Sequence, residues 1–255
     1  MGGKYKKINL KNMKLAIIIP ARYKSGRFPG KPLKEILGIP MVIRVAQIAE
    51  KATNKSNIYI ATEDNSIKDL AESYGFKAIM TSPHHHCCTD RVAEAATKID
   101  ADIIVNLQGD EPMIDPNEIS LAINAKLKYP KFVINCASKL KDFEKPEDRN
   151  IIKMAMGINN NLVCASRNPI PVTKSGKTPL CKKQVCIYVY NKHELEAFSN
   201  QKTTPLEEVE EVDILRFLEM GMPVKIIDVL GDSHAVDIPE DIEIVEKLLK
   251  QKHQK

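Results

Sequence analysis

Short apolar runs alternate with amphipathic segments through the first half of the chain. The apolar runs predict strands over residues 14–20, 58–62, 76–81 and 103–107. Apolar positions at helical spacing predict helices between them, over residues 40–51, 67–74 and 90–99, and Gly75 is a typical helix stop. Strands that alternate with helices form right-handed βαβ units. The pattern therefore predicts an α/β fold, with a Rossmann-like, mostly parallel sheet and helices on both faces.

The pattern loosens after residue 131. Strand-like runs joined by turns rich in Pro and Asn predict a mixed sheet, and they cover residues 132–138, 151–157, 162–166 and 184–190. We interpret residues 132–205 as a small lid or dimerisation lobe within a single domain that spans 14–255. A helix over 207–220, a strand over 224–230 and a terminal helix over 239–250 complete the prediction. The basic leader, residues 1–13, is expected to be disordered.

Composition narrows the class of protein. The chain has 255 residues, 43% of them hydrophobic, which suffices for one large α/β domain. No apolar stretch reaches the roughly 18–20 residues of a membrane span, and the leader lacks the apolar segment of a signal peptide. Much of the net charge of +5 lies in the leader and the Lys-rich tail, which argues against nucleic-acid binding. The six cysteines show no C-x-x-C spacing, so we expect reduced thiols in a cytoplasmic protein.

The first apolar run leads directly into a basic loop. Arg22, Lys24, Arg27 and Lys31 follow the run closely, among Pro and Gly residues. In an open α/β sheet, phosphate-bearing ligands bind outside the carboxyl ends of the strands. The glycine spacing differs from that of a P-loop. The loop is therefore predicted to bind a polyphosphate in another way, and a solvated basic turn is the alternative.

Two aspartates lie where strands are predicted to end. Asp110 follows Gly109 after the strand at 103–107, and Asp237 lies at a later junction between strand and helix. Mg²⁺ is usually held by one or two carboxylates together with phosphate oxygens and water. The two aspartates are therefore candidate Mg²⁺ ligands. The alternatives are a turn residue for Asp110 and a helix N-cap for Asp237.

Several motifs resemble those of one enzyme family. Residues 19–33 resemble the opening loop I-P-A-R-x-x-S-x-R-x-P-x-K-x-L of the CMP-sugar synthetases. Residues 106–112, N-L-Q-G-D-E-P, resemble the N-x-Q-G-D-E-P segment of the CMP-Kdo synthetases (3-deoxy-manno-octulosonate cytidylyltransferases). T-P-L-E at 204–207 and V-D-I-P-E-D at 236–241 resemble S-P-L-E and V-D-T-P-E-D of the same family. The matches follow the family's order along nearly the whole chain.

This resemblance implies a Mg²⁺-dependent cytidylyltransferase of lipopolysaccharide biosynthesis. In that family the anomeric hydroxyl of a 3-deoxy-2-ulosonic acid attacks the α-phosphorus of CTP, giving a CMP-sugar and pyrophosphate. The resemblance also implies a homodimer. Positioning and electrostatics carry most of the catalysis in such a transfer.

The resemblance also implies roles for single residues. Those implied in catalysis are Arg22, Lys31 and Asp110, and the implied Mg²⁺ ligands are Asp110 and Asp237. The implied nucleotide-binding residues are Pro20, Ala21, Arg22, Ser25, Arg27, Lys31 and Thr62. The implied substrate-binding residues are Arg91, Gln108, Gln184, Tyr188, Glu207, Glu210 and Ile214. Taken alone, each of these residue types is more often found at a surface than at a ligand, so the assignments depend on the resemblance.

The segments matched to the sugar pocket depart from the family pattern. Cys87 and Cys88 stand where the family has S-G, and Gln184, Cys186 and Ile214 stand where it has His, Gly and Gln. Loss of polar groups from a polyol site lowers affinity for the transition state. These departures favour another small acid as the acceptor, such as an amino-ulosonic acid, a sialic-type acid or a phosphonate. The match along nearly the whole chain keeps Kdo itself as the first expectation. A non-catalytic nucleotide-binding homologue is the alternative from a different class.

The run H-H-H-C-C at residues 84–88 suggests a zinc site at first sight. Adjacent residues on a strand alternate between faces, and zinc sites usually draw on separated ligand pairs. The matching segment of the resembled family contains His and binds no metal. The run is therefore not predicted to be a zinc site.

Overall fold

The computed structural model describes residues 13–24, 26 and 28–253, so all of the predicted leader except Met13 lies outside the described residues. The main sheet has nine strands, and its long path has the order β11-β7-β10-β6-β1-β4-β5. These strands are β1 (Leu15–Pro20), β4 (Ile58–Thr62), β5 (Lys77–Met80), β6 (Ile103–Leu107), β7 (Val133–Lys139), β10 (Lys182–Asn191) and β11 (Val224–Asp228). β8 (Lys153–Met156) and β9 (Leu162–Ser166) branch from β10.

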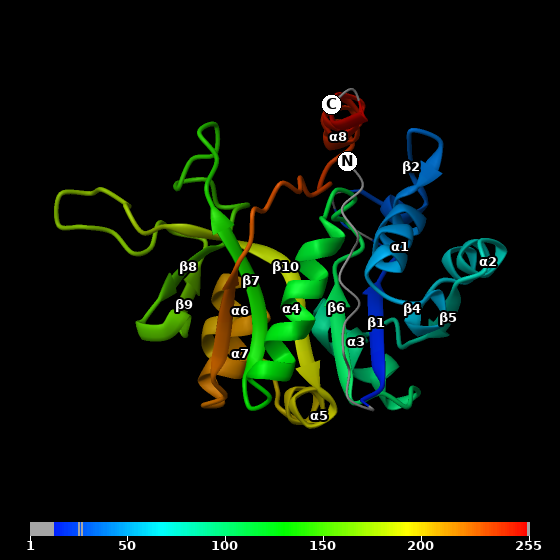
Figure 1. Ribbon diagram of the computed structural model, residues 1–255, viewed down its shortest axis with the longest axis horizontal. Helices are drawn as coiled ribbons and strands as arrows, with labels where there is room; N and C mark the ends of the chain where they lie inside the picture. The colour runs from blue at the N-terminus through cyan, green and yellow to red at the C-terminus, as the bar shows by residue number, and fades with distance from the viewer. Residues whose placement is uncertain (1–12, 25, 27, 254–255) are drawn as a thin grey trace.

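Neighbouring strands of the long path are parallel except at β10. β1 pairs in parallel with β4 and β6, and the pairs β4–β5 and β7–β11 are also parallel. β10 runs antiparallel to both β6 and β7. Figure 1 shows the resulting twisted sheet with helices on either side. The predicted α/β fold with a mostly parallel sheet is confirmed.

Two hydrophobic cores cover the two faces of the sheet. Successive side chains of a strand point to opposite faces. Ile17 and Ile19 of β1 therefore join the core under α1 (Met41–Ala52), α2 (Asn65–Ser73) and α4 (Pro116–Lys128). Ala16 and Ile18 join the core under α3 (Cys88–Thr97), α5 (Lys192–Asn200) and α7 (Ile214–Glu219). Burial on both sides explains why β1 is apolar throughout.

The elements predicted in the first half of the chain are all present, with ends within two residues of the prediction. Two helices, α4 and α5, were not predicted. Each begins with a signal that sequence reasoning could have used. The Asp115 side chain caps α4 ahead of a Pro at its first turn, and Asn191 forms a capping box with Glu194 at the start of α5.

The helix predicted over 207–220 is wrong as a single element. The structure has two short helices there, α6 (Pro205–Glu210) and α7. Glu211 ends α6 in the left-handed region, at φ 52°. An α-helix cannot continue through a left-handed residue, and the change of direction alters which side chains of the segment face the core.

The predicted lobe at 132–205 is only in part a separate feature. β7 and β10 lie inside the main sheet, where β10 pairs with β6. The β8–β9 hairpin and the long loop at 167–181 project to one side of the sheet (Figure 1). A role of these projecting segments as a lid or dimerisation surface stays a prediction.

The terminal helix α8 (Glu240–His253) packs near a small hairpin of β2 (Glu35–Ile36) and β3 (Ile39–Pro40). A third apolar cluster contains Phe28, Ile36, Val236 and Val245, and it joins α8 to the loop after β1. This packing brings the end of the chain back to the first strand. None of the helices in the described ranges is long and apolar enough to cross a membrane.

Candidate active site

A cavity of about 1820 Å³ lies at the carboxyl ends of β1 and β6. β1 lies between β4 and β6. The chain runs from β1 to β4 and β5 on one side, and then crosses back to β6 on the other side. This reversal of strand order is the switch point at which open α/β sheets bind ligands. The volume exceeds the roughly 300–1,000 Å³ that one drug-sized ligand usually occupies. The cavity is therefore large enough for two substrates at once.

Lys31 joins the two predicted metal ligands. Its Nζ lies 2.7 Å from Oδ2 of Asp110 and 3.9 Å from Oδ1 of Asp237. It also donates a 2.8 Å hydrogen bond to the carbonyl of Val236. Residues from the segments after β1 and β6 and from the loop before α8 thus meet at one point.

Gly109 allows the loops after β1 and β6 to approach each other. A Cβ at this position would lie 2.8 Å from the carbonyl oxygen of Pro20, closer than side chains tolerate. A glycine is therefore required for close approach, and the contact sets the position of Asp110 beside the basic loop.

The loop that carries Asp237 is fixed at several points. Gly231 N donates to Oε1 of Glu118 at 2.9 Å, and the Ser233 hydroxyl donates to Glu111. Val236 N donates to the carbonyl of Asp110 at 2.9 Å. These bonds replace regular secondary structure between β11 and α8, so the loop can hold a carboxylate in a defined place.

Glu111 is a buried acid that directly follows Asp110 in the sequence. Burial raises its pKa to about 7, although the hydrogen bond from Ser233 lowers it. Sequence reasoning assigned Glu111 no role, because its burial depends on the distant loop at 229–236. Here the side chain serves to fix that loop.

Arg91 lines the cavity but is already paired. Its Nη1 lies 2.9 Å from Oε2 of Glu63 and donates to the Thr81 hydroxyl at 2.5 Å. The other carboxylate oxygen of Glu63 accepts from Tyr23 N at 2.9 Å. Arg91 and Glu63 therefore brace the basic loop, and the charge of Arg91 is largely neutralised before any ligand binds.

A β-bulge in β10 shapes the wall opposite the basic loop. The register between β7 and β10 shifts between Val185 and Tyr188. The Asn135 amide donates to the carbonyls of Val185 and Ile187, at this register shift, at 3.0 and 2.9 Å. The Asn135 oxygen then accepts from Gln184 Nε2 at 2.9 Å. This network fixes Gln184, and the bulge places Tyr188 at the cavity.

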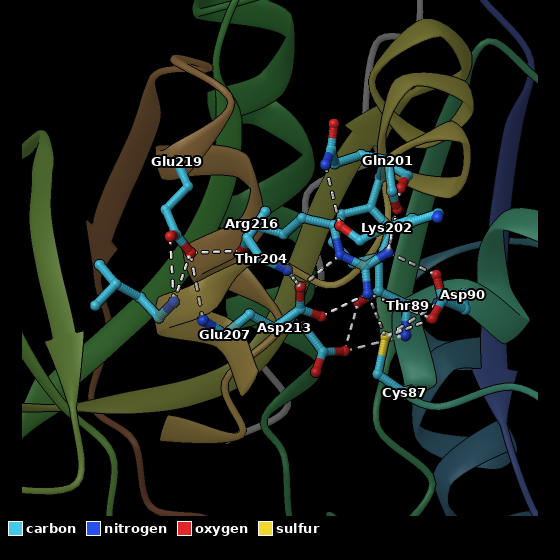
Figure 2. A network of polar contacts seen from close by, with 12 residues as sticks. Cys87, Thr89, Asp90, Gln201, Lys202, Thr204, Glu207, Asp213, Arg216 and Glu219 are labelled. Carbon is cyan, nitrogen blue, oxygen red and sulfur yellow. Dashed lines mark hydrogen bonds and ion pairs between the residues drawn. The ribbon is translucent and has the colours of Figure 1, made fainter. Parts of the chain in front are cut away.

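Arg216 is at the centre of a network of polar contacts, which Figure 2 shows. Cys87, Glu207 and Asp213 of this network line the cavity. The Nε and Nη2 of Arg216 donate to the two oxygens of Glu207 at 2.6 and 2.5 Å, and its Nη1 lies 2.9 Å from Oδ1 of Asp90. Arg216 is 2% exposed, so both partners compensate a buried charge. Glu207, predicted to bind substrate, lines the cavity mainly as a partner of Arg216.

Asp213 and Cys87 adjoin this network (Figure 2). Oδ2 of Asp213 accepts from the Thr89 amide and hydroxyl at 3.1 and 2.8 Å, and burial raises the pKa of Asp213. Within the described part of the chain, Cys87, Glu207 and Asp213 form a group with the spacing of metal ligands. Arg216 already supplies the positive charge there, which argues against a cation.

The thiols at the cavity are poor metal ligands at neutral pH. Burial raises the pKa of Cys88 to about 12, and it also raises the pKa values of Cys87 and Cys186. Thiolates, not thiols, bind metals. The carboxylates of Asp110 and Asp237 offer the hard oxygen ligands that suit Mg²⁺ instead.

The cavity collects most of the site residues predicted from the sequence. Those that line it are Pro20, Ala21, Arg22, Lys31, Arg91, Gln108, Asp110, Gln184, Tyr188, Glu207 and Asp237. Ser25 and Arg27 lie outside the described residues.

Three predicted residues lie away from the cavity. Thr62 is fully buried, and its hydroxyl accepts from Asp64 N at 3.2 Å. Glu210 accepts hydrogen bonds from the Ser166 hydroxyl and from Arg167 N. Ile214 is fully buried in the core under α7. Their positions do not agree with the predicted ligand contacts, because packing assigns them to the structural frame.

Comparisons with known proteins agree with this geometry. The profile of the cytidylyltransferase family matches residues 16–227. A 3-deoxy-manno-octulosonate cytidylyltransferase of Geobacter metallireducens is 39% identical over 92% of this chain and 98% of the relative. An 8-amino-3,8-dideoxy-manno-octulosonate cytidylyltransferase of Shewanella frigidimarina is 38% identical over 90% of this chain and 96% of the relative.

A solved structure also covers nearly the whole molecule. CMP:2-keto-3-deoxy-manno-octonic acid synthetase in complex with CTP superposes with a TM-score of 0.87 at 32% identity, over 94% of this chain and 99% of that one. The fold and the grouping of Lys31 with two aspartates at the switch point define a nucleotidyltransferase. The chain belongs to the cytidylyltransferase family, and its predicted resemblance to the CMP-Kdo synthetases is confirmed.

Proposed function

We propose that this enzyme transfers CMP from CTP to the anomeric hydroxyl of a 3-deoxy-2-ulosonic acid and releases pyrophosphate. The observation that carries the proposal is the meeting of Lys31, Asp110 and Asp237 in a cavity large enough for two substrates. A solved structure of this fold, 32% identical, is a complex with CTP, which supports CTP as the donor.

Asp110 and Asp237 fit a bound Mg²⁺, because their carboxylates converge on Lys31 Nζ and remain partly accessible. When bound, Mg²⁺ would neutralise phosphate charge and polarise the α-phosphate. With the two carboxylates compensated by Mg²⁺, Lys31 would be available as a point charge for the phosphates, and Arg22 can contact two phosphate oxygens at once. The frame around Gly109 holds these groups in place before CTP binds, which lowers the cost of reaching the transition state.

Kdo is the first candidate acceptor, because relatives with that named substrate align over almost the whole chain. An amino-ulosonic acid is the second. The cavity wall beyond Arg216 carries the carboxylates of Glu208, Glu211 and Asp213, which would attract an ammonium group. A relative named for 8-amino-3,8-dideoxy-manno-octulosonate supports this candidate.

A pyrophosphate-release assay tests the proposal. CTP, ATP and GTP are each offered with Kdo, its 8-amino analogue, a sialic-type acid and a phosphonate, with and without Mg²⁺. We expect turnover with CTP, Mg²⁺ and one of the two octulosonates. No release with any acid, despite measurable CTP binding, would identify a non-catalytic nucleotide-binding protein instead.

We also propose a cytoplasmic homodimer. The free thiols of the six cysteines are typical of a reducing compartment. Ile158 and Val163 near the β8–β9 hairpin are 86% and 66% exposed, and Val209 of α6 is 81% exposed. A dimer interface that covers these segments would remove such exposed apolar side chains from water. Light scattering of wild type and Val163→Glu measures the oligomer, and a monomeric wild type contradicts the dimer.

A further inference from the structure

The acceptor of the proposed reaction is an acid, so its carboxylate requires a cation in the cavity. The cationic side chains that line the cavity are Arg22, Lys31, Arg91, Lys145, Arg149, Arg167 and Lys183. A cation that is already paired with a carboxylate has little attraction left for a ligand. The cations that have no partner within the protein are therefore the ones available to bind the carboxylate of the acceptor.

Most of these cationic side chains already have a partner within the protein. Lys31 and Arg91 pair with Asp110 and Glu63 as described above. Lys183 pairs with Glu144. The Arg167 guanidinium donates to the backbone carbonyls of Glu210 and Glu211 in α6 and its C-cap, and to that of Arg149.

Among the described residues that line the cavity, this leaves Arg22, Lys145 and Arg149 as the cations whose side chains have neither an ion pair nor a hydrogen bond to the backbone. Arg22 belongs to the loop assigned to the nucleotide. Lys145 and Arg149 lie on the loop between β7 and β8, on the opposite wall. No ion pair joins Arg149 to the neighbouring acids Glu147 and Asp148. Its exposed guanidinium therefore stays available to a ligand.

The backbone that carries Arg149 is held from two sides. Lys153 is fully buried, and its Nζ donates to the carbonyls of Asp148 and Ile151 at 2.7 Å each, and to that of Arg167. The carbonyl of Arg149 itself accepts from Arg167 Nη1 at 2.8 Å. A buried lysine without a carboxylate partner is costly unless its donors are satisfied, and here backbone carbonyls satisfy them.

This anchoring distinguishes Arg149 from Lys145. The Asp148 side chain also accepts from Asn150 N at 2.9 Å, so the turn that contains Arg149 is closed by both side-chain and backbone bonds. A cation on a fixed backbone loses less conformational entropy when it binds a ligand. A guanidinium can also contact both oxygens of a carboxylate, which an ammonium cannot do with the same geometry.

We propose that Arg149 binds the carboxylate of the acceptor, and that Lys153 and Arg167 position it. This assignment depends on the proposed function, because it presupposes an acidic acceptor. It makes Arg149 a specificity-determining residue, held by backbone contacts rather than by a carboxylate of the chain.

The test compares Arg149→Gln, Arg149→Lys and the control Lys145→Gln with wild type. The probes are Kdo and the carboxamide of Kdo, which lacks the negative charge, and pyrophosphate release is measured at saturating CTP and Mg²⁺. We expect Arg149→Gln to raise the KM for Kdo by about 10- to 100-fold, the range for a hydrogen bond between charged groups. The KM for CTP should not change. Arg149→Lys should recover part of the loss, and Lys145→Gln should resemble wild type.

The carboxamide separates binding of the charge from a structural role. Wild type should prefer Kdo over the carboxamide, and Arg149→Gln should lose most of that preference. An equal rise in KM for both probes, an effect of Lys145→Gln as large as that of Arg149→Gln, or an unchanged KM in Arg149→Gln would overturn the assignment. A wild type that turns over no acid at all would overturn the proposed function and this assignment together. An active wild type whose KM for Kdo is unchanged by Arg149→Gln would overturn only the assignment.

Discussion

Gly231→Ala is expected to disturb the loop that carries Asp237. Gly231 has φ 64°, and a Cβ there would lie 2.1 Å from the Ser138 Oγ and 2.3 Å from the Ser138 Cβ. The left-handed conformation costs a residue with a Cβ about 1–2 kcal/mol. Forcing an extra methyl against Ser138 costs about 1–3 kcal/mol, and Ala recovers about 0.4–1 kcal/mol through the unfolded chain. We expect a net loss of about 2–4 kcal/mol in the free energy of unfolding.

The loss can be measured by thermal unfolding and by activity. For a chain of this size it corresponds to a fall in Tm of about 5–15 °C. Because the loop also presents Asp237, the Mg²⁺ concentration needed for half-maximal pyrophosphate release should rise in the variant. The atoms that would clash with the new Cβ belong to the side chain of Ser138, so Ser138→Gly should relieve the clash. The double variant should regain about 1–3 kcal/mol relative to the sum of the single losses.

Additive effects of the two substitutions would refute this reasoning. If Gly231→Ala and Ser138→Gly combine to within about 0.5 kcal/mol of their sum, the two residues do not compete for the same space. A Gly231→Ala variant with wild-type Tm and Mg²⁺ dependence would show that the loop adapts without cost.

Three further predictions follow from the site. Asp110→Asn and Asp237→Asn should each lower the rate of pyrophosphate release at saturating Mg²⁺ by orders of magnitude, with an unchanged circular dichroism spectrum. Near wild-type turnover in either variant would remove that aspartate from the site. Glu207→Gln should cost about 3 kcal/mol of stability by weakening the buried pair with Arg216, while the KM for the acceptor changes little; a large rise in that KM at wild-type Tm would restore the predicted substrate contact. Burial raises the pKa of Glu118 above 4.5, so the folded protein retains this proton to higher pH than the unfolded chain does. The stabilisation from protonated Glu118 is complete below pH 4.5 and is lost as pH rises through the pKa of the folded protein. The free energy of unfolding of wild type should therefore fall with rising pH relative to that of Glu118→Gln. Parallel curves of unfolding free energy against pH would contradict the shift.

Local sequence signals predicted the first half of the fold well, because each element there carries its own pattern. The apolar run of β1 reflects burial on both faces of the sheet, and Gly75 ends α2 in the left-handed region that a helix stop requires. The cavity residues Lys31, Asp110 and Asp237 were identified from motifs, and the structure brings them together. Such predictions succeed where the physical constraint acts within a few residues of the signal.

Local sequence signals are missing where the interaction partner lies far away along the chain. The sequence cannot show that Arg91 is neutralised by Glu63, because the pairing depends on the alignment of β4 with α3. Ile214 matches a position predicted to face the sugar, yet the left-handed Glu211 ends α6 and α7 directs Ile214 into the core. Whether a side chain faces a ligand or a core depends on the rotation of its helix about its axis, which packing against the sheet decides.

The sequence by itself determined the class of fold, the family and the chemical types of the groups that we propose to act on CTP. Those properties follow from periodicity and from short motifs. Only the tertiary structure decided which charges remain free, that Gln184 is fixed by Asn135 across a β-bulge, and that Arg149 lies on a wall braced by Lys153. A charge is available to a ligand only when no other group compensates it, and the compensating groups come from segments that meet only after the chain has folded.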